Sequence, residues 1–291
     1  MAHRLVGCSG FRQIAREFGV SPQTVLGLSA RIGRQCLLFH ETLRPRGELR
    51  EPLALDGFRS FERSQYHPTE FHLAIGQQSH YLHGFTDSEL RRSGSMRPGQ
   101  RRRRARLEAQ WGRPDPRSTE REVATLLGIV TEGATSLTLH TDEHQDYPRA
   151  LARQRHLATV AHHTVSSRAA RTPRNPLFAI NLFDLLLRHS GANHKRETIA
   201  FSKRRQSAAE RLWLTLVWRN YVKSFSERKR DATPAMRAAV CGTRWSLQAI
   251  LAERRFISQV QLPERWERYY WGRTPTRGLP RARAHTLRYA A

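Results

Sequence analysis

The chain has 291 residues, with 50 Lys and Arg against 25 Asp and Glu, and this net charge of +25 is typical of proteins that bind nucleic acid. Hydrophobic residues make up 38% of the chain, which excludes a disordered basic tail, and no apolar stretch has the length of a membrane span or a signal peptide. The three cysteines form no Cys-x-x-Cys pair, so we expect no disulfide framework or zinc site, and a reduced, cytoplasmic, nucleoid-associated bacterial protein.

Residues 11–35 have the pattern of a helix-turn-helix. Apolar residues recur at helical spacing up to Phe18, Gly19 interrupts them, and Ser21-Pro22 is a favourable start for a second helix. Such a helix places its first residues in the major groove of DNA. The expected base contacts are Gln23 and Thr24, and the expected phosphate contacts are Arg31 and Arg34. The alternative is a helical hairpin that packs on the main domain.

From residue 53 on, the spacing of apolar residues changes from that of helices to that of strands. Residues 53–61, 70–77 and 80–85 read as three strands in succession, which predicts an antiparallel meander covered by a helix. Residues 91–117 contain several Gly and Pro and read as a basic loop. Its run of arginines, Arg101, Arg102, Arg103 and Arg104, is either a solvated linker or a clamp on the DNA backbone.

Helices and strands alternate after this loop. The expected elements are, in order, a helix at 118–132, a strand ending at Asp142, a short helix at 147–154, a strand at 157–166 and a helix at 177–190. Together with the three earlier strands, this is the element order of the α/β ribonuclease-H-like fold, a mixed sheet flanked by helices.

The last part of the chain reads as helices outside that core, at 207–223, 233–240 and 246–255. Residues 263–291 combine aromatic residues with arginine and proline, and they read as irregular. They would either track a nucleic-acid strand by stacking or wrap the domain as a structural tail. The predicted division is a DNA-binding segment at 1–42, a catalytic domain at 43–225 and a basic C-terminal extension at 226–291.

Two aspartates, Asp56 and Asp142, follow apolar strand residues at the ends of two predicted neighbouring strands, 86 residues apart. Magnesium prefers oxygen ligands and usually takes one or two carboxylates plus phosphate oxygens, so a phosphodiester is the expected substrate. A two-metal site needs a third acid. Asp184 is the candidate, on the same helical face as Asn181 and Arg188, and Glu197 is the reserve. Four nearby histidines would assist proton transfer or pack: His140, His144, His162 and His163.

Several of these motifs together resemble insertion-sequence transposases of the DDE superfamily. They are Asp56 followed by Gly-Phe-Arg-Ser-Phe, Thr141-Asp142 followed by Tyr147, Asn181-x-x-Asp184-x-x-x-Arg188, and the run that ends in Phe-Ser-Lys203. The resemblance covers about residues 11 to 223. It implies a helix-turn-helix before a ribonuclease-H-like catalytic domain, with Mg²⁺ or Mn²⁺ as cofactor.

The resemblance makes Asp56 and Asp142 the first two catalytic acids and metal ligands. Asn181 occupies the position of the family's glutamate, and Asp184 the position of its asparagine, about 4.5 Å further along the helix. Arg188 and Lys203 would contact DNA. The implied partners are double-stranded DNA, at the element's terminal inverted repeats and at the target, and a second copy of the chain. The alternative is a catalytically inactive, decayed or domesticated copy that only binds DNA.

Overall fold

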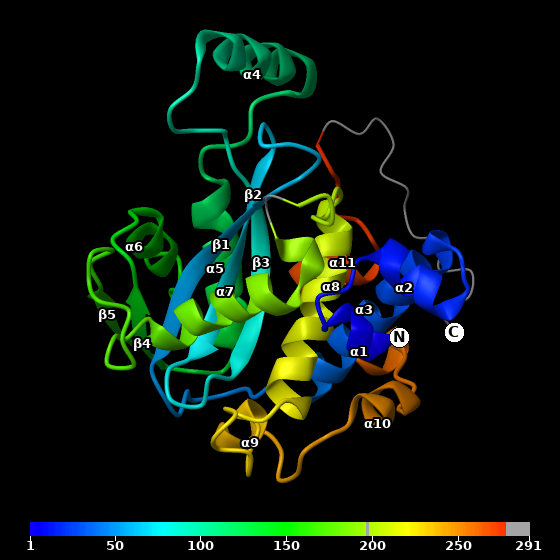
Figure 1. The fold of residues 1–291 in the computed structure, drawn as a ribbon. Coiled ribbons are helices and arrows are strands. Elements are labelled where there is room, and N and C mark those ends of the chain that lie inside the picture. The colour runs from blue at the N-terminus through cyan, green and yellow to red at the C-terminus, as the bar shows by residue number, and fades with distance from the viewer. Residues whose placement is uncertain (196–197, 278–291) are drawn as a thin grey trace.

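A five-stranded mixed sheet forms the centre of the computed structural model, which describes residues 1–195 and 198–277 (Figure 1). The strand order is β3-β2-β1-β4-β5. β1 (Leu53–Phe61), β2 (Pro68–Gly76) and β3 (Leu82–Glu89) are antiparallel neighbours, whereas β4 (Ser136–Thr141) and β5 (Thr159–Thr164) continue the sheet parallel to β1. The predicted meander is confirmed, and the arrangement is consistent with a ribonuclease-H-like fold.

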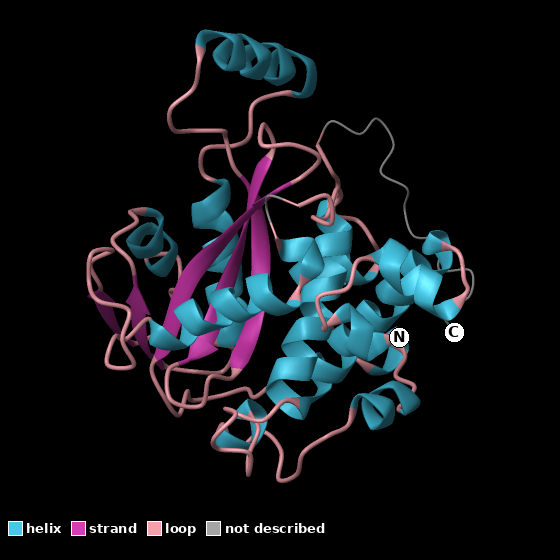
Figure 2. Ribbon diagram, viewed as in Figure 1, coloured by secondary structure: helices cyan, strands magenta, loops and turns pink. Residues whose placement is uncertain are grey.

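Helices cover both faces of this sheet (Figure 2). Alternate residues of β1 point to opposite faces, so Leu53 and Leu55 pack with α5 (Ser118–Val130) and α6 (Asp146–Leu151). Ala54 and Phe58 belong to the larger core on the other face, together with α7 (Phe178–Ser190) and α8 (Arg205–Val217). The start of β1 is therefore buried from both sides, which explains the continuous apolar run Leu53–Leu55.

The N-terminal helices are α1 (Ala2–Leu5), α2 (Phe11–Phe18) and α3 (Pro22–Leu43). Ser21 caps α3, because its hydroxyl accepts a hydrogen bond from Thr24 N at 3.1 Å. The second half of α3 is buried against α8, and residues such as Cys36 and Phe39 belong to the large core. This helix is thus also part of the main body, as the hairpin alternative expected, and its role in reading DNA stays a prediction. The division into three segments stays a prediction too.

The expected loop at 91–117 is wrong for its middle part, which forms α4 (Pro98–Trp111). Pro98 and Gly99 suggested a break, but proline is well tolerated in the first turn of a helix, and the Arg, Ala, Leu, Glu and Gln that follow favour helix. α4 has no buried residue and projects from the rest of the molecule on two connecting segments (Figure 1). Arg91 holds its far end through an ion pair with Glu108 at 2.8 Å.

The C-terminal part adds short elements around the large core: α9 (Pro234–Arg237), α10 (Leu247–Ala252), η3 (Ile257–Gln259) and α11 (Glu264–Tyr270). Two further single turns, η1 (Ala192–His194) and η2 (Trp218–Val222), lie before and after α8. The expectation of an irregular segment from residue 263 is wrong for α11. Trp266 is fully buried, packs where Gly84 has no Cβ, and donates its indole N–H to Phe85 O at 2.9 Å. Its ring is not available to stack on a nucleic acid. At this position the segment therefore packs on the domain, as the alternative of a structural tail expected. Residues 278–291 lie outside the described residues.

Candidate acidic site and nucleic-acid interface

Asp56 and Asp142 occupy corresponding positions along two adjacent parallel strands: Asp56 lies on β1, and Asp142 directly follows β4. β1 and β4 pair through Leu53 with Leu139 and through Ala54 with His140, and this ladder ends there. Asp56 follows Ala54 by two residues, and Asp142 follows His140 by two residues. The two aspartates therefore lie near each other where the strands separate, and their roles as catalytic acids and metal ligands stay predictions.

Burial and neighbouring acids change the chemistry of Asp56. Its pKa is raised to about 6, chiefly because burial disfavours the charged form, and further by the negative charges of Asp142 and Glu70. The backbone N–H of Gly57 opposes this shift by donating to the Asp56 carboxylate at 2.7 Å. Asp142 is partly buried and accepts a hydrogen bond from His144 N at 2.9 Å.

Glu70 is a charged neighbour of Asp56 that sequence reasoning missed, and it lies on the opposite face of β1. It lies on β2, where its carboxylate occupies the space that a Cβ on Gly57 would fill, and it forms an ion pair with Arg59 at 2.8 Å. Burial and then the charges of Asp56, Asp142 and Glu70 raise the pKa of Tyr147, so its hydroxyl stays protonated beside the acids. A signal was present, because a hairpin that joins two antiparallel strands brings an acid at the start of the second strand close to the first.

The third predicted acid is not assembled with the first two. Asp184 lies on α7 beside the stripe of Ile180, Phe183 and Leu187 that packs into the large core. Across residues 1–195 and 198–277, no three His, Cys, Asp or Glu side chains form a group that could hold a metal ion. The role of Asp184 as third ligand stays a prediction, and Glu197 lies outside the described residues.

Arg188, predicted to contact DNA, braces the end of β1 in the structure. Its guanidinium donates to Arg59 O at 3.0 Å and to His194 O at 3.1 Å. It also lies 4.3 Å from the centre of the Phe58 ring. These contacts connect α7 to the strand that carries Asp56, and the contact of Arg188 with DNA stays a prediction.

The histidines near the acids are arranged along β4, β5 and the loop after β4. His140 and His163 stack with ring centres 4.9 Å apart, and His162 is hydrogen-bonded to the Thr141 hydroxyl at 2.9 Å. Burial lowers the pKa of both His140 and His162, which favours their neutral forms near pH 7. His144 accepts a hydrogen bond from Asp146 N at 3.3 Å. These histidines lie on or next to β4 and β5, the parallel end of the sheet that precedes Asp142.

The four predicted DNA contacts of α3 differ in their surroundings. Gln23 is exposed, whereas the Thr24 hydroxyl is engaged in the helix cap with Ser21 at 2.9 Å. Arg31 is exposed, but Arg34 is half-buried near Glu210 and Tyr270, and burial lowers its pKa. Their contacts with bases and phosphates stay predictions.

The four arginines of the basic run lie along α4. Arg101 donates to Met96 O at 3.0 Å, and Arg104 donates to Arg92 O at 3.0 Å. Arg103 stacks on Tyr66, 5.1 Å from its ring centre, and Arg102 is exposed. The structure thus replaces the predicted loop by a projecting basic helix.

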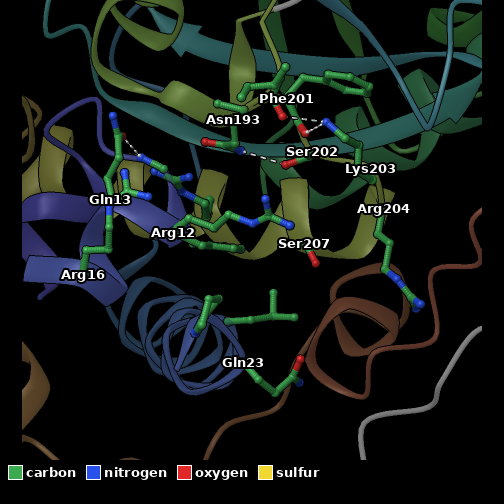
Figure 3. Close-up of a pocket in the computed structure, with 17 residues that line it drawn as sticks. Arg12, Gln13, Arg16, Gln23, Asn193, Phe201, Ser202, Lys203, Arg204 and Ser207 are labelled. Carbon is green, nitrogen blue, oxygen red and sulfur yellow. Dashed lines mark hydrogen bonds between the residues drawn. The ribbon is translucent and has the colours of Figure 1, made fainter. Parts of the chain in front are cut away.

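Lys203 lines a cavity of about 730 Å³ between α2, the start of α3 and the segment that leads into α8 (Figure 3). Its ammonium group donates to Ile199 O at 2.8 Å and to Phe201 O at 3.1 Å. Gln23 lines the same cavity, so the structure brings together two predicted DNA contacts that are 180 residues apart in the sequence.

No protein-family model matches the sequence, and no curated protein matches it. Among solved structures, the fold is similar to a chain in the cryoEM structure of the simian T-cell lymphotropic virus intasome in complex with PP2A regulatory subunit B56 gamma. The identity is 13%, the TM-score is 0.30, and the match covers 67% of this chain and 58% of that chain. This similarity is too low to assign a function. The helices of the described residues include none that is long and apolar enough to cross a membrane.

Proposed function

We propose that the protein is a divalent-metal-dependent DNA transposase that cuts and joins DNA strands by phosphoryl transfer. The observation that carries this proposal is the pair Asp56 and Asp142, which occupy corresponding positions on adjacent parallel strands where these strands separate. Two partly buried carboxylates that repel each other are a fitting pair of hard oxygen ligands, because a divalent cation would neutralise them. The net charge of +25 then favours DNA as the phosphodiester.

Asp56 and Asp142 would hold Mg²⁺ or Mn²⁺, which supplies Lewis-acid activation of a phosphate oxygen and of the attacking hydroxyl when it is bound. The protein's other groups position these acids. Glu70 and Arg59 form an ion pair beside Asp56, and Arg188 holds the end of the same strand against α7. Asp184 on α7 is the proposed third acid, as the sequence resemblance implies.

DNA would be held by two separate elements, α4 and the start of α3. The projecting helix α4 carries the exposed Arg101 and Arg102, and the start of α3 carries Gln23. We propose double-stranded DNA at the ends of a mobile element and at its target as the substrate, and a homodimer as the form that pairs two ends. The expected location is the bacterial cytoplasm, associated with the nucleoid.

A second candidate function is DNA binding without catalysis. It is favoured by one observation, the lack among the described residues of a third side chain that completes a metal-holding group with Asp56 and Asp142. In this case Asp56 and Asp142 would no longer hold two metal ions, and the basic surfaces would still bind DNA.

Cleavage of DNA separates the two functions. A supercoiled plasmid that carries the DNA flanking the protein's gene is incubated with the purified protein and Mg²⁺ or Mn²⁺, and nicked or linear products are mapped. An active transposase cuts at defined ends, and Asp56→Asn and Asp142→Asn abolish cutting. Reproducible binding without cutting would instead support the inactive DNA-binding protein.

The same assay identifies the third acid. Asp184→Asn and Glu70→Gln are compared with the wild type at equal DNA occupancy, measured by gel shift. Loss of cutting in Asp184→Asn, with Glu70→Gln still active, assigns the third position to Asp184. The reverse result assigns it to Glu70, whose charge raises the pKa of Asp56.

A further inference from the structure

The cavity that Lys203 lines contains cations from three separate parts of the chain. Arg12 and Arg16 come from α2, Lys203 and Arg204 precede α8, and Arg211 lies on α8. None of the described residues that line the cavity is acidic. Figure 3 shows the α2 residues on one side of the cavity, and Lys203 and Arg204 across from them. A concave site with this charge is suited to an anion.

Arg211 is the most unusual of these cations because it is almost fully buried. Its guanidinium donates to Leu5 O at 2.5 Å and to Ser9 O at 3.3 Å, both neutral carbonyl groups, and lies 5.3 Å from the centre of the Phe11 ring. Burial lowers its pKa to about 10, so it still carries its charge at neutral pH. A buried positive charge beside a cavity is stabilised when an anion enters that cavity.

The cavity also has apolar and amide groups, which a simple phosphate ion would not need. Phe11, Leu26 and Phe201 provide apolar surface, and Gln13, Gln23 and Asn193 provide amides. Asn193 is 4% exposed, and its side-chain nitrogen donates to the Ser202 hydroxyl at 3.1 Å. Its side-chain oxygen is buried without a hydrogen-bond partner among the described residues. Gln23 is exposed and lines the cavity, and its amide offers a donor and an acceptor to the edge of a base.

We infer that this cavity binds one unpaired nucleotide of a DNA strand, with its phosphate at the cations and its base toward the aromatic and amide groups. A volume of about 730 Å³ accommodates one nucleotide, whereas a base-paired duplex presents only its phosphates to a concave site. Base and phosphate together satisfy both kinds of lining group. DNA as the strand rests on the proposed function, and the cavity itself is separate from the acidic pair.

The test is fluorescence anisotropy with a short labelled single-stranded oligonucleotide and with a labelled hairpin duplex, at fixed salt. The double variant Arg12→Gln/Lys203→Gln removes two cations from opposite walls. The double variant Arg155→Gln/Arg254→Gln is the matched control, since both arginines are exposed and neither lines the cavity. The cavity variant should weaken single-strand binding by about tenfold more than the control, with a smaller effect on the duplex.

A third variant separates the cavity from its charge. Leu26→Trp fills the cavity and leaves the net charge unchanged, so it should reduce single-strand binding and spare duplex binding. Thermal unfolding of each variant checks that the fold is retained, and the exposed Arg12 and Lys203 keep the test valid if Leu26→Trp does not fold. The inference is overturned if the cavity variant behaves like the matched control, or if folded Leu26→Trp binds single strands as the wild type does.

Plasmid cleavage, measured in parallel on the wild type, keeps this inference apart from the proposed function. Cavity-dependent binding without cleavage supports the nucleotide site and counts against the transposase. Cleavage together with single-strand binding that does not depend on the cavity overturns the nucleotide site alone.

Discussion

The backbone of Gly33 on α3 lies against the backbone of Glu210 on α8, so closely that a Cβ on Gly33 would overlap the main chain of Glu210. This contact joins the N-terminal helices to the large core that also covers the sheet. Glycine is required here for close helix packing, although it lowers the intrinsic stability of a helix.

Gly33→Ala should therefore destabilise the protein by about 1–3 kcal/mol, because main-chain atoms cannot move aside as a side chain can. Gly27→Ala in the same helix is the control, since nothing lies within 4 Å of its Cβ position. It should stabilise the protein by up to about 1 kcal/mol through helix propensity. Urea unfolding measures both, and equal effects from the two variants would contradict the close helix contact.

Asp87 should be among the acids most important for stability. It is fully buried on β3, where it pairs with Arg265 at 2.8 Å and Arg205 at 3.1 Å and accepts a hydrogen bond from the Tyr269 hydroxyl. Asp87→Asn leaves two buried arginines without their shared partner, so we expect a loss of about 3–5 kcal/mol in the free energy of unfolding.

Asp115→Asn is the control for this change, since Asp115 is exposed and its ion pair with Arg121 at 2.6 Å lies in solvent. Burial raises the pKa of Asp87, but the two arginines outweigh it and lower that pKa below its usual value. The contribution of Asp87 is present above pH 3.8 and declines as the pH falls further. Similar unfolding midpoints for the two variants would refute the importance of the buried network.

Acid should destabilise the fold through buried histidines that the folded chain keeps neutral. Burial lowers the pKa of His194 from 6.5 to about 3, so the unfolded chain takes up a proton near pH 6 and the folded chain does not. The stabilising effect of neutral His194 is complete above pH 6.5 and declines as the pH falls. Between pH 6.5 and pH 5, its share of this decline is about 2 kcal/mol.

His194→Phe removes this proton uptake and keeps a ring that packs edge-on against Phe58 and Phe71. Unfolding free energies of the variant should fall less steeply with decreasing pH than those of the wild type. His40, His80 and His83, whose pKa values burial lowers to about 3, 4 and 4, are present in both proteins and contribute to the remaining slope. Parallel curves for the two proteins would show that His194 is not buried in its neutral form.

The projecting helix α4 should contribute to duplex binding through charge alone. Arg101→Gln/Arg102→Gln is expected to weaken duplex binding and to reduce the dependence of log affinity on log salt by about 0.9 for each lost phosphate contact. The control variant Arg155→Gln/Arg254→Gln carries the same change in charge at exposed positions elsewhere. A salt dependence equal to that of the control would make α4 a solvated helix without a role in DNA binding.

The sequence by itself determined the pattern of the sheet and the position of its two central acids. Alternation and apolar runs are local properties, so the strand at 53–61 and the strand ending before Asp142 were predicted at nearly their observed bounds. The excess of basic residues likewise depends on composition alone.

Only the tertiary structure decided which distant residues meet. The helical pattern of residues 22–35 does not show that α3 is buried against α8, because this depends on the backbone contact between Gly33 and Glu210. Glu70 lies against β1 because Gly57 leaves room for its carboxylate. The burial of Trp266 follows in the same way from the space at Gly84. Such contacts form between segments far apart in the chain, where packing and charge pairing outweigh local propensity, so no window of sequence contains them.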